Sequence, residues 1–459
     1  MPLFTNVGSS AMRTNGRTLG ALLLLVLTVT VAAALPLVYF TNLPSLYDER
    51  FGSILAPKIY LLALLACGPF LLLDRMRVTA FIRQPYVLWL GALFLLNVVC
   101  IFRLGFIDGT ISDREDMLRI TRQLLLAPAF AYLVWSIDTS WFVRFIKALC
   151  ILAPAMVLFD FLNPGVMYDY TGLDGATSGR AGGPWFNANV AAEALLLALV
   201  LGCARFGRTA SIAVYLLIGA AVIVTGSRSG MVGWLLVGAL LIHRRALPRV
   251  MLLTPIVLTV FYGTIYIFLE DLASSIPEHQ EGASRLLARL DFVSGNVDAT
   301  EGGGSQRFEV AENALRETLG RPILGYGYAY EDQITEIGAG PHNLIIQMWH
   351  LYGLPGLLLW GSLAWMLLGR DRIRGLANPA LFCFVWFSFF SHNILGDNHW
   401  YVFFALLFFA TNKSPRVSVS GGGLHGISRD VGDVLPRRVR GSRRTSRPGR
   451  RRRPRSVSW

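Results

Sequence analysis

A series of twelve apolar segments constrains the fold of this 459-residue sequence more than any other feature. A transmembrane helix needs about 17 to 25 mostly apolar residues. The chain is 54% hydrophobic and only 15% charged, whereas soluble domains are about 25% charged. We therefore expect an all-α, polytopic membrane protein with about twelve transmembrane helices. The predicted spans are 19–40, 54–73, 86–102, 118–137, 141–162, 188–204, 211–225, 229–242, 251–269, 342–368, 379–394 and 399–411.

The basic residues orient these segments, because Lys and Arg gather in cytoplasmic connections. Every second connection is basic, and the others are neutral or acidic. The longest, 270–341, holds thirteen Asp and Glu against five Arg, so we expect it to face outward. The basic connections contain Arg75, Arg77 and Arg83; Arg144 and Lys147; Arg205 and Arg208; Arg244, Arg245 and Arg249; and Arg370, Arg372 and Arg374.

This topology divides the chain into five parts. They are a cytoplasmic N-terminus (1–18), nine helices (19–269), a large outer loop containing short helices (270–341), three further helices (342–411) and a cytoplasmic tail (412–459). The first span has the composition of a signal peptide, but its cleavage would leave eleven spans and break the charge alternation. We therefore interpret it as an uncleaved anchor. The short seventh and eighth spans are also consistent with one broken hairpin.

Most of the net charge of +13 comes from the tail. Residues 413–459 contain fourteen Lys and Arg against two Asp, so the rest of the chain is nearly neutral. The Arg, Ser, Pro and Gly composition predicts a disordered segment that contacts anionic membrane lipid. No aromatic residue interleaves the arginines before Trp459, so we expect no nucleic-acid partner.

Several kinds of chemistry are excluded by missing residues. None of the three lysines follows a glycine, so there is no phosphate-binding loop for ATP hydrolysis. The five cysteines all fall within or at the ends of predicted spans, and no His/Cys cluster has metal-ligand spacing. We expect no metal and no cofactor. A reaction must then take its free energy from an activated substrate, and a lipid-linked diphosphate is the natural one on the outer side.

The segment from Pro341 to Gly356 joins the outer loop to the tenth span. With Pro341 at the first helical position, His342, Gly353 and Gly356 would share one face, within about 40° of one another, with His342 at the water boundary. Transfer from a glycosyl diphosphate needs one base for the acceptor hydroxyl and cations for the leaving diphosphate.

His342 is the candidate base, and Arg228, Arg307 and Arg180 are the candidate diphosphate ligands. Simpler roles stay open: a helix cap for His342, and lipid-phosphate anchors for Arg180 and Arg228. A second outer cluster, Ser391-His392-Asn393 with Asp397-Asn398-His399, is a rival base or an acceptor-binding rim. His350 is expected to be a hydrogen-bonded residue inside the bundle.

Together these motifs resemble the O-antigen ligase family, which also includes related polymerases. The resemblance runs from about 178 to 356, and the topology extends it to about 411. The sequence departs from the family at Ala188, where proline is common between the two asparagines, at Pro355 and in the basic tail. The motifs are His342-Asn343 followed after nine residues by Gly353-x-x-Gly356, then Arg307, Gly325-Tyr-Gly327, Ser227-Arg228-Ser229-Gly230, and Arg180 with Asn187 and Asn189. Asn187 and Asn189 can also cap the helix of the sixth span.

The resemblance implies an inner-membrane glycosyltransferase whose active site faces the periplasm and which needs no metal. His342 would be the base, and Arg228 and Arg307 would act in catalysis and bind the donor. Arg180, Tyr326, Tyr328 and Asn343 would also bind the donor, an undecaprenyl-diphosphate-linked polysaccharide; the acceptor would be lipid A-core. A polymerase using the same donor and a twelve-span transporter are the alternatives.

Overall fold

The computed structural model describes part of the chain. All described residues belong to the first of two units, 1–414 and 415–459. They form helices and no strand, which confirms the all-α prediction for this part of the chain. The described residues are 34–44, 46–47, 75–103, 114–136, 139–163, 166–167, 180–257, 260, 263–264, 267, 304–328, 343–369, 377–391 and 393–410.

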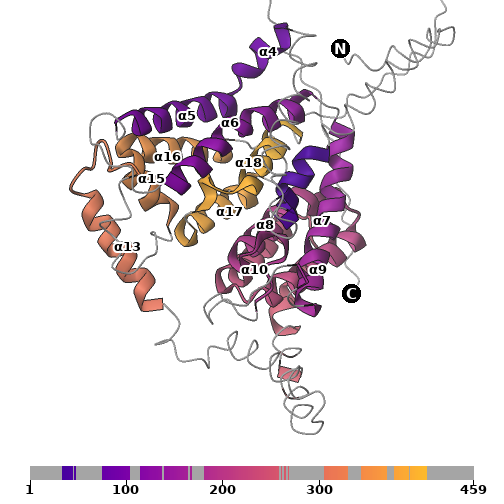
Figure 1. Ribbon diagram of the computed structural model, residues 1–459. Helices are drawn as coiled ribbons and strands as arrows, with labels where there is room; N and C mark the ends of the chain where they lie inside the picture. Colours follow the sequence, from indigo (N-terminus) through magenta and orange to yellow (C-terminus); the bar gives the residue numbers. More distant parts are fainter. Residues whose placement is uncertain are drawn as a thin grey trace, which may run out of the picture. The chain divides into compact units, whose positions relative to one another are not determined.

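The helices follow the apolar segments of the sequence closely (Figure 1). Short 3-10 helices, labelled η, extend or join several of them, and a π-helical turn ends α18. The α-helices are α4 (Arg75–Ile82), α5 (Pro85–Arg103), α6 (Arg114–Ser136), α7 (Thr139–Leu162), α8 (Ala188–Gly202), α9 (Arg208–Val224), α10 (Arg228–His243), α13 (Gly304–Thr318), α15 (Leu344–Tyr352), α16 (Leu354–Leu368), α17 (Ala377–Phe390) and α18 (Asn398–Ala405). The short elements are η2 (Gly183–Trp185), η3 (Cys203–Arg205), η4 (Arg249–Leu253), η6 (Asn393–Leu395) and the π turn η7 (Leu406–Ala410).

Four of the described helices are long and apolar enough to cross a membrane: 85–103, 117–136, 141–162 and 188–205. Shorter apolar helices lie at 208–224, 228–243, 354–368, 379–390 and 398–410. On α5, Leu88, Leu95 and Phe102 are each more than half exposed. An apolar surface of this kind is typical of contact with lipid. The second span and the tail, most of the first span and of the loop 270–341, and part of the ninth span lie outside the described residues.

Helix α8 lies at the centre of the described helices. Its sequence is apolar all round, as expected for a helix surrounded by protein, and residues 190–202 are all buried. Small residues bring α10 close: Gly230 packs against Ala192, and Gly233 against Leu196. Because later residues of one helix meet later residues of the other, α8 and α10 run in the same direction. Their N-termini therefore lie at the same end.

The prediction that residues 341–356 form one helix is wrong. Helix α15 begins at Leu344, because the Asn343 side chain accepts hydrogen bonds from the backbone N–H groups of Ile345 and Ile346. It ends at Tyr352, because Gly353 adopts a left-handed conformation with φ of 66°. A Cβ on Gly353 would collide with the carbonyl group of Ile323. The backbone that packs tightly against this glycine belongs to the turn at Ile323–Gly325, not to a second membrane helix.

Candidate functional site

Two capped helix N-termini frame the candidate site. Asn187 caps α8, with its side-chain oxygen 2.8 Å from the N–H of Asn189. Ser227 caps α10, with its hydroxyl 3.2 Å from the N–H of Gly230. The sequence predicted the first cap correctly. Because α8 and α10 are parallel, the partial positive charges of both N-termini lie at one end of the helix pair.

Arg180 joins these two helix starts. Its Nε donates to the carbonyl of Thr225 at 3.0 Å, and its Nη2 donates to the side-chain oxygen of Asn189 at 2.9 Å. Gly226, with φ of 63°, lets the arginine lie against the turn between α9 and α10. The guanidinium is thus fixed beside the start of α10 by two contacts.

Asp160 of α7 binds the backbone of the loop that carries Arg180. One carboxylate oxygen of Asp160 accepts from the N–H groups of Gly182 at 3.1 Å and Gly183 at 2.8 Å. Asp160 is only 2% exposed. Sequence reasoning missed this residue, although an acidic side chain near the end of a predicted span was the available signal.

Arg228 is the first residue of α10 and is exposed. It lies two positions after Gly226, against which Arg180 packs, so the structure brings these two predicted arginines to the same turn. The carbonyl of the next residue, Ser229, accepts from the indole N–H of Trp386 at 3.0 Å. This contact attaches α17 to the start of α10.

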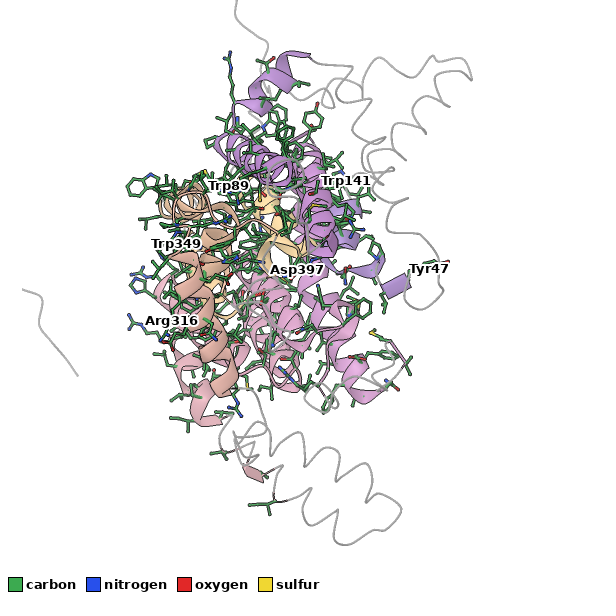
Figure 2. All side chains as sticks on the ribbon, turned by 60° about the vertical axis from the view of Figure 1, so that its left-hand side comes forward. Tyr47, Trp89, Trp141, Arg316, Trp349 and Asp397 are labelled. Atoms are coloured by element: carbon green, nitrogen blue, oxygen red, sulfur yellow. The ribbon has the colours of Figure 1, made fainter. Side chains whose placement is uncertain are left out.

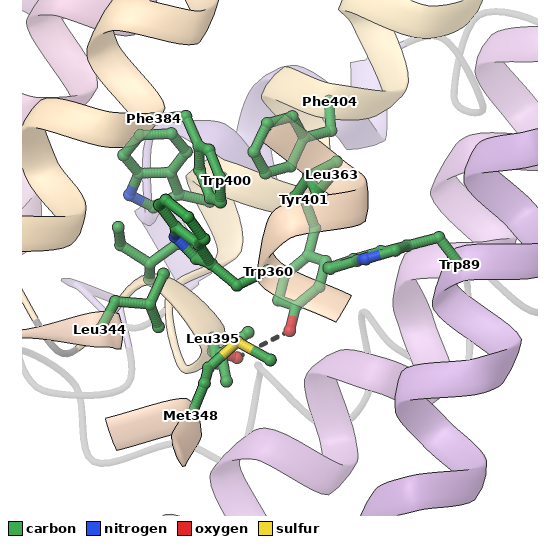
Figure 3. A pocket seen from close by; sticks show the side chains of 11 residues that line it. Trp89, Leu344, Met348, Trp360, Leu363, Phe384, Leu395, Trp400, Tyr401 and Phe404 are labelled. Atoms are coloured by element: carbon green, nitrogen blue, oxygen red, sulfur yellow. Dashed lines mark hydrogen bonds between the residues drawn. The ribbon is translucent and has the colours of Figure 1, made fainter. Parts of the chain in front are cut away.

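Helix α17 also reaches the start of α15. Phe384 of α17 and Leu344 of α15 line the same apolar cavity, whose other walls come mainly from aromatic side chains (Figure 3). At the edge of this cavity the Tyr401 hydroxyl donates to the carbonyl of Leu395 at 2.9 Å. The starts of α10 and α15 therefore both contact α17. Asn343, a predicted donor-binding residue, lies at this point, and its side-chain oxygen caps α15.

The predicted tyrosines belong to residues 320–328, here called the anchor segment. The Tyr328 hydroxyl is buried and donates to the side-chain oxygen of Asn97, which also accepts from Tyr352 at 3.0 Å. Tyr326 stacks on the imidazole of His350, with ring centroids 5.0 Å apart. Both side chains thus make contacts within the protein.

Hydrogen bonds to its backbone also attach the anchor segment to the neighbouring helices. The N–H of Tyr326 donates to the carbonyl of His350 at 2.6 Å, and that of Gly327 to Leu351 at 3.1 Å. Arg103, at the end of α5, donates to the carbonyls of Leu324 and Gly325, both at 2.9 Å. The anchor segment is therefore attached to both α5 and α15, and sequence reasoning did not identify Arg103.

The structure describes less of the other two predicted catalytic residues. His342 lies outside the described residues and is bonded directly to Asn343. Arg307 lies in the first turn of α13, where the backbone alone is described. Helix α13 lies beside α15 (Figure 1).

A second polar cluster lies deeper, between α8 and α18. Glu193, one turn after Asn189, accepts from the indole N–H of Trp400 at 3.0 Å, and its Oε2 is 3.9 Å from Nε2 of His399. One ligand atom each from Glu193, Asp397 and His399 lies within 4.8 Å of the others. Figure 2 shows Asp397 inside the helices, away from the peripheral Arg316 and Trp349. His399 is 2% exposed, so this residue lies deep in the protein and not on an open rim.

These three residue types are possible ligands of a divalent cation. Donor atoms in a tetrahedral zinc site, with bonds of about 2.0 to 2.1 Å, are about 3.3 to 3.5 Å apart, closer than the spacing here. The guanidinium of Arg119 lies against Gly396, the neighbour of Asp397 in the chain. The cluster therefore has the character of a buried polar network more than that of a metal centre.

Comparison with known families supports the interpretation of the sequence motifs. The family model described as O-Antigen ligase matches residues 213–361. The matched segment contains Arg228, Arg307, His342, Asn343 and both motif glycines, 353 and 356; Arg180 precedes it. No curated protein matches the sequence significantly. The resemblance noted in the sequence is thereby confirmed for residues 213–361, which are similar to the O-antigen ligase family.

Proposed function

We propose that this protein is an O-antigen ligase of the bacterial inner membrane. It transfers polysaccharide from undecaprenyl diphosphate to a sugar hydroxyl of lipid A-core on the periplasmic side. The observation that carries the proposal is the meeting of Arg180 with the turn that leads into Arg228, at the parallel N-termini of α8 and α10. The family match supports the class of reaction.

Two arginines and two helix N-termini at one place suit a diphosphate group. Arginine binds phosphate oxygens through paired N–H donors, and helix N-termini add partial positive charge. The hydrogen bonds of Arg180 to Thr225 and Asn189 hold its guanidinium in place before the donor arrives. The exposed Arg228 is accessible to a lipid-borne headgroup. Preorganised positive charge of this kind stabilises the negative charge that develops on the leaving group.

The reaction is a single displacement with inversion and requires no metal. The acceptor hydroxyl oxygen attacks the anomeric carbon of the donor, and the bond between that carbon and the diphosphate oxygen breaks. The bonding electrons leave with undecaprenyl diphosphate, whose charge Arg228, Arg307 and Arg180 neutralise. His342 accepts the hydroxyl proton as general base. Asn343, bonded to His342, fixes the start of α15 through its cap.

The two tyrosines have different positions in this scheme. Tyr326 is half-buried and its ring lies on His350, so one edge is available near the outer surface. Tyr328 is buried, and its hydroxyl already binds Asn97. We therefore propose that any contact with donor sugars falls to Tyr326 and that Tyr328 supports the anchor segment.

A gel of lipopolysaccharide from a strain lacking the gene tests the function. Complete core without O-antigen, with polymer retained on the lipid carrier, is the expected result for a ligase. Core bearing a single repeat unit would identify a polymerase, and an unchanged ladder would refute both and favour a transporter or another polysaccharide.

The same deletion strain tests the assignment of His342 as the general base. A plasmid carrying wild-type protein should restore the ladder, and one carrying His342→Ala should not. His243→Ala is the matched control, because His243 is exposed at the far end of α10 from Arg228. Equal membrane levels of the three proteins must be verified by blotting. A full ladder with His342→Ala would refute its assignment as the base.

A further inference from the structure

Helix α13 packs along α15 through a narrow stripe of side chains. Val310 and Ala314 of α13 are buried together against Ile346 of α15. One turn further along each helix, Thr318 meets His350, and both are fully buried. Later residues of α13 meet later residues of α15, so the two helices run in the same direction.

This direction places the first turn of α13 near the start of α15. The Thr318–His350 contact makes Ala314 level with Ile346, so Asn343 is level with Ala311. Arg307 lies four residues before Ala311, which is about 6 Å at 1.5 Å per residue. A parallel pair with these contacts therefore brings the turn of α13 that carries Arg307 to within about one helical turn of the capped start of α15.

The donor and the acceptor of the Thr318–His350 hydrogen bond can be assigned from the distances. The Thr318 hydroxyl lies 2.6 Å from the carbonyl of Ala314 and 3.1 Å from Nδ1 of His350. A hydroxyl can donate only one hydrogen bond, and the Thr318 hydroxyl donates it to the nearer group, the Ala314 carbonyl. The threonine oxygen therefore accepts from His350, which fixes the tautomer with the proton on Nδ1.

The anchor segment covers this hydrogen bond. Tyr326 stacks on the His350 ring with an angle of 12° between the planes, and the guanidinium of Arg321 lies 5.0 Å from the Tyr326 ring centre. The carbonyl of His350 also accepts the N–H of Tyr326. His350 thus contacts α13 through the hydrogen bond of its Nδ1. It contacts the anchor segment through the stacked face of its ring and through its backbone carbonyl.

We propose that His350 is a positioning residue that locks α13 onto α15 and so holds the turn carrying Arg307 near the start of α15. The lock itself follows from the contacts above. Its effect on transfer rests on the proposed function. Because its ring is fully buried, His350 acts through α13 and the anchor segment.

Cysteine labelling tests the lock without any transfer assay. In full-length protein in detergent or nanodiscs, Ala314→Cys places a thiol in the α13–α15 interface, where Ala314 is fully buried. Adding Thr318→Val or His350→Leu should speed maleimide labelling of this thiol by about five- to a hundred-fold, because a buried polar group left unpaired favours local opening by factors of this order.

Matched variants make the labelling result specific. Thr318→Ser keeps the hydroxyl, and His350→Asn keeps an N–H near the Nδ1 position, so both should stay close to the slow parent rate. Leu315→Cys, 38% exposed on the same helix, should label quickly in every background. Protein without the introduced cysteine gives the background from native thiols. Unchanged slow labelling in both Thr318→Val and His350→Leu would overturn the lock.

Transfer kinetics then test the consequence. With the lock broken, kcat/KM for the donor should fall about ten-fold or more, KM for the acceptor should stay constant, and His350→Asn should restore the donor value. Faster labelling with unchanged donor kinetics would overturn the link to Arg307. Absence of transfer in the wild-type protein would count against the proposed function and leave the labelling result intact.

Discussion

At the scale of single residues, Arg180 and Arg228 share a turn but differ in their surroundings. Arg180 is half-buried and holds the loop before α8 to the turn before α10 through two hydrogen bonds. Arg228 is exposed at the first position of its helix. Arg180 therefore contributes both to the architecture and to the local charge, and Arg228 places a second positive charge at the solvent-exposed side of the same turn.

Substitution by glutamine should separate these roles. Arg228→Gln should lower kcat/KM for the donor about ten- to a thousand-fold with little change in stability, because it removes a charge aimed at the leaving group. Arg180→Gln should lower donor use and also destabilise the protein by about 1 to 3 kcal/mol, because it leaves hydrogen-bonding partners unpaired.

Thermal unfolding and single-turnover kinetics on the same preparations check both arginines. Arg316→Gln is the control, because Arg316 is exposed on α13 and pairs only with Glu312 on its own helix. Equal donor kinetics for Arg228→Gln and Arg316→Gln would remove Arg228 from the site.

At the scale of elements, the decisive feature is the crossing of the anchor segment over the break between α15 and α16. Gly325 and Gly353 both have positive φ and pack backbone to backbone. The N–H of Leu354 donates to the carbonyls of Pro322 at 3.0 Å and Ile323 at 3.1 Å. The loop thereby supplies a partner for a backbone group exposed by the break. This crossing explains Gly325 and Gly353, whereas Gly356 packs against the Met348 carbonyl of α15.

Gly353→Ala should destabilise the protein by about 3 kcal/mol or more, because a Cβ there meets the Ile323 carbonyl and the left-handed conformation adds strain. Gly361→Ala in the middle of α16 should be neutral or stabilising by about 0.5 to 1 kcal/mol, because nothing lies near its Cβ position. Thermal melting of the two variants in identical detergent gives the comparison. A melting temperature for Gly353→Ala equal to that of Gly361→Ala would contradict the crossing.

At the scale of the whole molecule, the candidate site is built where several helices begin. The starts of α8 and α10 are joined by Arg180, and α17 connects the start of α10 to that of α15. All these contacts lie within residues 1–414. The basic segment 415–459 belongs to the second unit.

Deleting residues 415–459 should leave membrane insertion and the transfer rate within about two-fold of the full-length values, because the described contacts of the candidate site all lie within residues 1–414. Binding to vesicles containing anionic lipid should weaken, by about 1 kcal/mol per basic residue that contacts the surface. Transfer assays and vesicle co-sedimentation measure the two effects. Loss of transfer in a normally inserted truncated protein would show that the tail belongs to the active unit.

The sequence by itself determined the helical class, the resemblance to the O-antigen ligase family and most helix positions, because long apolar segments, short motifs and capping residues act locally. Asn187 and its cap were predicted correctly, and His350 was correctly expected to be a hydrogen-bonded bundle residue. The tertiary structure decided what depends on contacts between distant segments. The break at Gly353 exists because residues 322–327 cross there, and Asp160, Arg103 and Glu193 were missed because their partners lie 22 to 222 positions away. Spacing along one helix cannot reveal such contacts, since they depend on how separate segments pack.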